Sequence, residues 1–133
     1  MRPILVTLES TPLYRRMLLN VIARNQDDHT ENIGYLMDGE GELRLSPAFD
    51  VVYSYHPQGA WTQNHQMSIN GKTKDFSKND FLHVASEMGI RDGERILNQV
   101  VEVVSGWRQY AEAAGVDESQ AKSIGSSHRE LSD

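Results

Sequence analysis

The sequence predicts a mainly α-helical protein with one short β-hairpin. Two observations predict this fold class: apolar residues recur at helical spacing in several segments, and one turn sequence separates two short apolar runs. No period of about 20 to 50 residues repeats, which argues against a solenoid. The 133 residues, of which 38% are hydrophobic, are enough for the single core of one ordinary domain.

The first helix is expected over residues 12–24. Thr11 followed by Pro12 has the form of an N-cap with proline at the first helical position. Upstream of it, the alternating Val6 and Leu8 could form a short edge strand. The apolar residues that recur at helical spacing after Pro12 are Leu13, Met17, Leu18, Val21 and Ile22.

A β-hairpin and a long loop are expected next. Residues 33–37 and 42–45 are short apolar-rich runs, and the Asp-Gly-Glu-Gly sequence between them is a strong reverse-turn signal. Residues 46–74 then show little periodicity, with prolines and glycines punctuating several aromatic residues. We expect an ordered loop there, and loops of this length are often functional.

The rest of the chain is expected to be helical. Ser77 with Asp80 predicts a capped helix that ends before Gly89, and its inward-facing residues would be Phe81, Leu82, Val84, Ala85 and Met88. A longer helix is expected over residues 92–114, with an apolar stripe of Ile96, Leu97, Val100, Val101, Val104, Trp107 and Ala111. Asp117 with Gln120 begins a last helix, which frays into the polar tail 126–133.

The composition excludes several classes of protein. Without cysteine, the chain has no disulfide, thiolate nucleophile or cysteine-based metal site. The formal charge of −6, from 13 Lys and Arg against 19 Asp and Glu, argues against a general nucleic-acid binder. No apolar run reaches the roughly 18 residues of a membrane helix, and the first residues do not read as a signal peptide. We therefore expect a cytoplasmic protein.

Polar residues with ligand chemistry concentrate in residues 24–32, between a helix end and a strand. One interpretation is that the Asn and Asp side chains only cap the helix and form a turn. A second acidic residue, Asp50, is flanked by Phe49 and Val51, and its desolvation costs free energy unless it meets a cation or donors. Because a hairpin brings its ends together, Asn32 and Asp50 are expected to lie near Asp27.

The order of these residues is the pattern that kinase-type phosphoryl transfer requires. It consists of an Asp, an Asn five residues later, a hairpin, and then an Asp beside a Phe. The first Asp would accept the proton of the substrate hydroxyl, while the Asn and the second Asp would offer oxygen ligands to Mg²⁺. The same acids with Asp28 and His29 could instead form a metal-dependent phosphohydrolase centre, but a second acidic cluster with hydrolase spacing is absent from the sequence.

Residues 20–33 and 45–51 closely resemble the C-terminal lobe of the HipA-like serine/threonine kinases, the toxin kinases of bacterial toxin–antitoxin systems. The Asp-x-His-x-x-Asn motif at 27–32 carries the resemblance, which extends through the His-Gln-Met-Ser-Ile-Asn-Gly-Lys stretch at 65–72 and the following helices. The resemblance implies the helical C-terminal lobe of a kinase-like fold over residues 13–125. Residues 1–12 form a divergent segment, and residues 126–133 a polar tail.

The resemblance also implies roles for five residues and the ligands ATP and Mg²⁺. Asp27 would be the catalytic proton acceptor, and Asn32 and Asp50 would bind Mg²⁺ and through it the nucleotide. His29 and Phe49 would line the nucleotide site. The family's substrates are aminoacyl-tRNA synthetases and its inhibitor is a small DNA-binding antitoxin, so both are expected partners, without direct contact to nucleic acid or to a membrane.

Part of the family's active site has no counterpart in these 133 residues. They contain no phosphate-binding loop, no lysine that contacts ATP and no regulatory serine of the family's N-terminal lobe. Because positioning and electrostatic clamping supply most of phosphoryl-transfer catalysis, we expect the isolated chain to have little or no kinase activity. Three interpretations stay open: a split kinase completed by an N-terminal lobe in trans, a truncated remnant, or a non-catalytic module that binds an antitoxin or a partner lobe. His65 could be a ligand and Lys72 could contact phosphate or an acidic substrate, but both are interpreted as loop residues bonded to their own backbone and are left out of the catalytic set.

Overall fold

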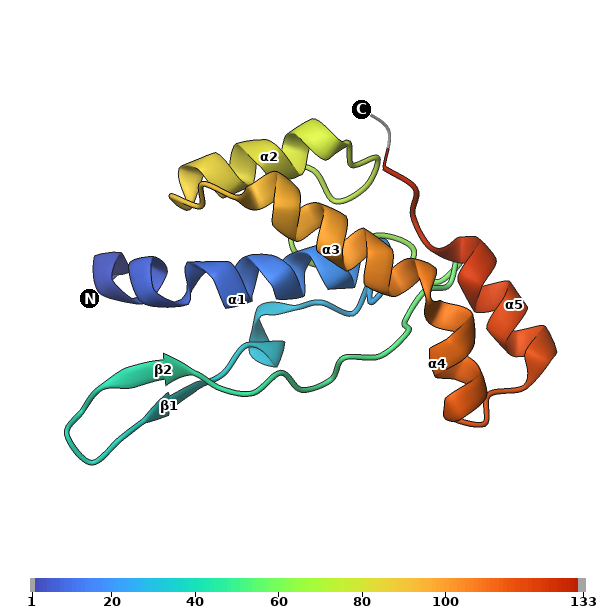
Figure 1. The fold of residues 1–133 in the computed structure, drawn as a ribbon, viewed down its shortest axis with the longest axis horizontal. Coiled ribbons are helices and arrows are strands. Elements are labelled where there is room, and N and C mark those ends of the chain that lie inside the picture. The colour runs from blue at the N-terminus through green and yellow to red at the C-terminus, as the bar shows by residue number, and fades with distance from the viewer. Residues whose placement is uncertain (1, 132–133) are drawn as a thin grey trace.

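The computed structural model describes residues 2–131, which form a mainly helical fold with one two-stranded antiparallel sheet (Figure 1). The predicted fold class, mainly α with one hairpin, is confirmed. Within the described range, no helix is long and apolar enough to cross a membrane. The helices and strands in chain order are α1 (Arg2–Ile22), the short 3-10 helix η1 (Thr30–Asn32), β1 (Tyr35–Met37), β2 (Leu43–Leu45), α2 (Lys78–Glu87), α3 (Gly93–Ser105), α4 (Trp107–Ala113) and α5 (Glu118–Ser127).

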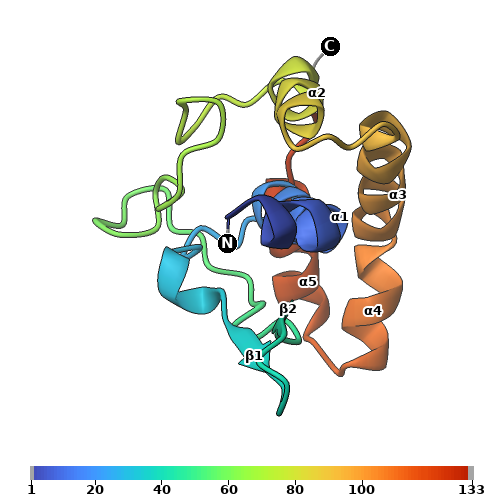
Figure 2. The ribbon, with the colours of Figure 1, turned by 90° about the vertical axis from the view of Figure 1, so that its left-hand side faces the viewer.

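Helix α1 is the central element of the core. Viewed along its axis, α1 has α3 on one side and the long loop on the other (Figure 2). Its buried residues follow helical spacing and meet apolar side chains of α2 and α3, so the core is formed by elements far apart in the sequence. The fully buried large apolar side chains of this core are Tyr14, Leu18, Val21, Ile22, Phe81, Ile96 and Leu97.

Helix α1 begins earlier than predicted. It starts at Arg2 and contains Pro12 in its interior, so the predicted start at Thr11 and Pro12 is wrong, and the strand considered for Val6 and Leu8 does not form. The φ angle of proline suits a helix, and its missing N–H removes a single backbone hydrogen bond, to the carbonyl of Leu8. The remaining hydrogen bonds allow one continuous helix.

The end of α1 is set by a left-handed residue. Arg24 has a φ of 62°, and the next N–H, that of Asn25, donates to the carbonyl of Asn20 over 2.8 Å. This geometry is a common helix end, although glycine is the usual residue at the left-handed position. It turns the chain directly into the polar segment 25–32.

The hairpin and the following loop are formed as predicted. Strands β1 and β2 pair antiparallel, with Tyr35 opposite Leu45, and the Asp38 carboxylate accepts hydrogen bonds from the turn N–H groups of Glu40 and Glu42, each over 2.9 Å. Residues 46–74 contain no helix or strand beyond two isolated bridges, Asn25 with Ser54 and Ile69 with Lys72.

Helix α2 has the predicted cap. The Ser77 side chain bonds the backbone of Asp80, and the Asp80 carboxylate accepts from the Ser77 N–H, which forms a complete capping box. Gly89, with a φ of 72°, follows the end of the helix. Phe81 and Ala85 are buried as predicted, and the other three residues expected to face inward, Leu82, Val84 and Met88, are partly buried.

The long helix predicted over residues 92–114 is in fact two helices. Gly106 separates α3 from α4, and its N–H bonds the carbonyl of Val103, three residues back. Glycine is a poor helix former, and Trp107 directs α4 towards α5 because its indole N–H donates to the carbonyl of Ala121 over 2.8 Å. Of the predicted stripe, Ile96, Leu97, Val100, Val104 and Ala111 are buried, Trp107 is partly buried, and Val101 is 41% exposed.

The C-terminal segment returns to the core after α5. Asp117 caps α5 by accepting from the N–H of Gln120, as predicted. Of the expected polar tail, residues 126 and 127 are the last residues of α5, and residues 132–133 lie outside the described range. The N–H of Arg129 bonds the carbonyl of Ile22 over 2.9 Å, and Leu131 packs against the core. The described part of this segment is therefore attached to the end of α1.

Candidate functional site

Two loops that are distant in the sequence run side by side at the end of α1. The N–H of Gln26 donates to the carbonyl of Ser54 over 2.8 Å, and the N–H of Ser54 donates to the carbonyl of Arg24 over 3.0 Å. This short parallel pairing attaches the segment before Asp27 to the segment after Asp50. Together with the hairpin, it brings the two halves of the predicted site together.

Four of the five predicted site residues line one pocket of about 200 Å³. They are His29, Asn32, Phe49 and Asp50. The other walls come from α1, from the loop at residues 67–69 and from Met88. A largely apolar pocket with a few polar groups is the usual form of a small-molecule site, so this pocket is the candidate functional site.

Asp27 lies beside this pocket rather than in its lining. Its side chain is 54% exposed, and its Oδ1 lies 3.8 Å from Nε2 of His29. The side-chain amide of Asn32 donates to the Asp27 carbonyl over 3.0 Å. Asn32 therefore fixes the backbone that carries Asp27, and its Oδ1 remains available to coordinate a cation or to accept a hydrogen bond.

Asp50 has an unusual backbone. Its φ of 53° is in the left-handed region, which asparagine and aspartate tolerate better than most residues. Its carbonyl accepts a hydrogen bond from the Asn25 side chain over 3.1 Å, which holds the conformation. Among the described side chains the Asp50 carboxylate has no hydrogen-bond or ion-pair partner, so it is available to a ligand. Such backbone strain is often found at functional sites.

The oxygen atoms of Asn32 and Asp50 suit Mg²⁺. Mg²⁺ prefers oxygen ligands and is commonly held by one or two carboxylates together with substrate phosphates and water. Within residues 2–131, no group of three or more His, Cys, Asp or Glu side chains is arranged to hold a metal. The residues present therefore fit a magnesium ion that arrives with a phosphate ligand, and they do not form a complete protein cage for a metal.

A buried Asp28–His65 pair supports the loop that carries Asp27. Nδ1 of His65 lies 2.8 Å from Oδ2 of Asp28, and the other carboxylate oxygen accepts the N–H of Gln66 over 2.8 Å. Both side chains are almost completely buried. The expectation that His65 bonds its own backbone is therefore wrong: its partner is 37 residues away in the sequence, where no local pattern points to it.

Lys72 also has a distant partner instead of the expected local one. Its Nζ bonds Oδ2 of Asp80 over 2.8 Å, and Asn70 bonds Oδ1 over 2.9 Å. Burial alone would raise the pKa of Asp80, but the hydrogen bonds from Lys72, Ser77 and Asn70 outweigh it and hold that pKa well below its ordinary range. This network attaches the loop that forms one wall of the candidate pocket to the start of α2.

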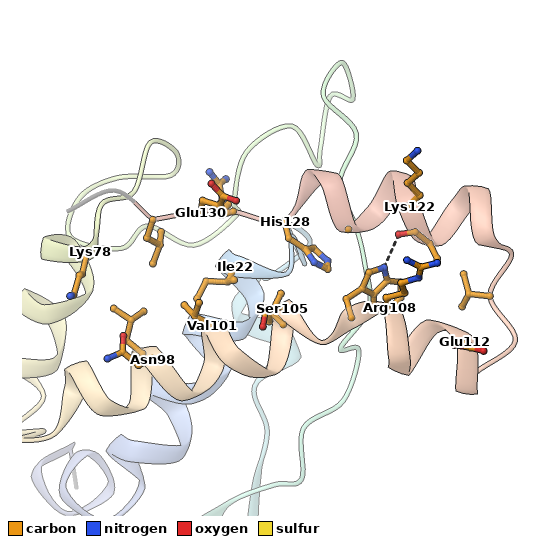
Figure 3. A pocket seen from close by; sticks show the side chains of 18 of the residues that line it. Ile22, Lys78, Asn98, Val101, Ser105, Arg108, Glu112, Lys122, His128 and Glu130 are labelled. Carbon is orange, nitrogen blue, oxygen red and sulfur yellow. Dashed lines mark hydrogen bonds between the residues drawn. The ribbon is translucent and has the colours of Figure 1, made fainter.

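A larger pocket, of about 1060 Å³, lies elsewhere in the fold. It is formed by α3, α4, α5 and the C-terminal segment, with Val101, Arg108, Lys122 and His128 around it (Figure 3). None of the five predicted site residues lines this pocket. We therefore take the smaller pocket, which is lined by four of the five predicted site residues, as the candidate site.

A family model covers most of the chain. The model of the HipA-like C-terminal domain matches residues 6–125. The chain therefore belongs to the family of HipA-like C-terminal domains, whose context is that of toxin–antitoxin systems and kinases. Comparison with curated proteins and with solved structures finds no match.

Proposed function

We propose that this domain is the catalytic-loop lobe of a HipA-like toxin serine/threonine kinase, which transfers the γ-phosphoryl group of ATP to a protein hydroxyl. The observation that carries the proposal is the convergence of His29, Asn32, Phe49 and Asp50 on one pocket, beside the Asp27 loop. An exposed carboxylate, two oxygen ligands and a nearby ring are the parts that this lobe contributes in kinase-type phosphoryl transfer.

Each residue has a separate task in this proposal. Asp27 accepts the proton of the attacking hydroxyl, and its exposed carboxylate is accessible to a protein substrate. Asn32 and Asp50 bind Mg²⁺, which when present neutralises charge on the ATP phosphates. His29 and Phe49 line the nucleotide site. The proposed substrate is an aminoacyl-tRNA synthetase, the proposed inhibitor is a DNA-binding antitoxin, and the proposed location is the cytoplasm.

Exposed apolar side chains near the site support the proposal that a second lobe packs against this domain. On strand β1 and at residues 49–53 of the loop after β2, seven large apolar residues are between 39% and 69% exposed. An apolar surface of this kind usually marks a protein contact. The same surface supports the second candidate function, a non-catalytic module that binds an antitoxin or a partner kinase lobe. The residues concerned are Tyr35, Leu36, Met37, Phe49, Val51, Val52 and Tyr53.

Calorimetric titration of the chain with Mg²⁺–ATP tests the proposal. We expect binding that is lost in Asp50→Ala and in Asn32→Ala and is kept in Glu40→Ala, which removes an exposed acid from the hairpin turn. Phosphotransfer is then measured after an N-terminal kinase lobe is added, with Asp27→Ala as the inactive control. Mg²⁺–ATP binding without phosphotransfer in the completed protein would favour the non-catalytic module.

A further inference from the structure

Two guanidinium groups converge behind the candidate catalytic loop. Nη1 of Arg24 and Nη2 of Arg129 both donate to Oε1 of Gln26, each over 3.0 Å. Gln26 is completely buried, so the two positive charges meet at the edge of the protein interior. Like charges at such a short separation repel each other unless an anion lies between them.

Neither arginine is neutralised by a carboxylate. Among the described side chains, Arg24 and Arg129 form no ion pair. Each guanidinium instead lies over an aromatic ring, Arg24 at 4.3 Å from the centre of Tyr55 and Arg129 at 5.3 Å from the centre of Phe76. Nε of Arg129 is buried and has no hydrogen-bond partner. A buried donor without an acceptor costs free energy, and the two arginines therefore lack both a counter-charge and a full set of acceptors.

The two arginines line an open pocket of about 450 Å³ that shares no residue with the candidate nucleotide pocket. Its lining holds two arginines and two acids, but the two guanidinium groups are adjacent, whereas, among the described side chains, neither acid is paired with them. Burial and then the charge of Arg24 lower the pKa of Arg129 to about 10, and the same two causes lower the pKa of His128. The two acids are Asp75 and Glu130.

We propose that Arg24 and Arg129 form a binding site for a tetrahedral oxyanion, either inorganic phosphate or the phosphate group of a monoester. A carboxylate has two oxygens, which one planar guanidinium can engage fully, whereas a phosphate has enough oxygens for both guanidinium groups. The bound anion accepts from N–H groups of both guanidinium groups and offsets the repulsion between the two charges. Because Gln26 precedes Asp27, the anion also fixes the start of the catalytic loop.

Calorimetric titration with sodium phosphate, without magnesium or nucleotide and at constant ionic strength in sodium chloride, tests the proposal. We expect phosphate to bind at least tenfold more weakly to Arg24→Lys and to Arg129→Lys than to the unchanged chain. Arg108→Lys, at an exposed arginine beside Glu118, is the matched control and should bind phosphate unchanged. O-phosphoserine distinguishes the two sources: tighter binding than that of inorganic phosphate assigns the site to a monoester, and equal or weaker binding assigns it to free phosphate.

Three results would overturn the proposal. The first is a phosphate affinity that both lysine variants leave unchanged. The second is phosphate binding only in Asp75→Asn, which would mean that the Asp75 carboxylate already neutralises the arginines in solution. The third needs no variant: in the ¹H–¹⁵N spectrum of the arginine Nε–H groups, phosphate should shift the signals of Arg24 and Arg129, and unmoved signals would exclude binding there.

Discussion

Replacing Asp80 by alanine should destabilise the fold strongly, because one buried carboxylate holds together the pocket loop and the start of α2. Asp80 is 5% exposed and accepts hydrogen bonds from the Lys72 ammonium, the Asn70 amide, and the N–H and hydroxyl of Ser77. Removing one member of a buried ion pair costs about 3 to 5 kcal/mol. Lys72 is 45% exposed and can regain water, so we expect about 3 kcal/mol for Asp80→Ala.

Urea unfolding of the purified chain measures this difference, with Lys72→Ala as the matched control. Lys72→Ala should cost only about 1 kcal/mol, because Asp80 keeps its three other hydrogen bonds and the lysine is half exposed. A loss of less than about 1 kcal/mol for Asp80→Ala, or equal losses in the two variants, would refute the view that this carboxylate organises the loop.

The same carboxylate predicts an acid dependence of stability. The pKa of Asp80 is lower in the folded chain than its ordinary value of 3.8. Its stabilising contribution is therefore fully present above that value and is lost as the pH falls below it towards the folded pKa. The difference in unfolding free energy between the unchanged chain and Asp80→Ala should shrink as the pH is lowered from about 4. A difference that is constant down to pH 2 would contradict this reasoning.

Three further predictions concern the core and the helix contacts. Burial raises the pKa of Tyr14 to about 12, so the stability of the fold should decrease as the pH rises from about 10 towards that value. Tyr14→Phe should lower the unfolding free energy at neutral pH by about 1 kcal/mol, because it removes the hydrogen bond to the Phe81 carbonyl, and it should weaken the alkaline dependence. Urea unfolding at a series of pH values measures both effects. Gly93→Ala should cost about 1 to 3 kcal/mol, because its new Cβ would lie 2.5 Å from Cβ of Ala85, whereas Gly39→Ala, with no atom within 4 Å, should change the thermal midpoint little. Gly125→Ala should loosen the contact between α5 and α4, since the new Cβ would lie 3.0 Å from Cδ1 of Trp107, and an unchanged tryptophan fluorescence and thermal midpoint would contradict this.

The parts of the fold that could be predicted are those encoded by neighbouring residues. The hairpin depends on the turn at residues 38–41, and the starts of α2 and α5 depend on caps formed within four residues, so each signal is local. The start of α1 and the break at Gly106 could not be predicted in this way. Pro12 and Gly106 are ambiguous signals, because a helix tolerates proline at the cost of one hydrogen bond, and the contact of Trp107 with α5 contributes to the break.

Some contacts of the candidate site could be predicted from the order of residues along the chain, and others could not. Because a short hairpin must bring its ends together, the approach of Asn32 and Asp50 to one pocket follows from chain order. The Asp28–His65 pair and the contact between Arg24 and Arg129 join residues 37 and 105 positions apart, the second through the Gln26 side chain. Tertiary packing creates these contacts, and the spacing of residues along the chain gives no sign of them.

Mg²⁺–ATP titration of the unchanged chain, Asp50→Ala and Asn32→Ala is the measurement that tests the central claim most directly. The claim is that the pocket beside Asp27 holds a magnesium–nucleotide complex. It predicts saturable binding to the unchanged chain that requires Mg²⁺ and disappears in both variants, while their unfolding midpoints remain close to that of the unchanged chain. Binding that survives in both folded variants, or no binding to the unchanged chain, would contradict it.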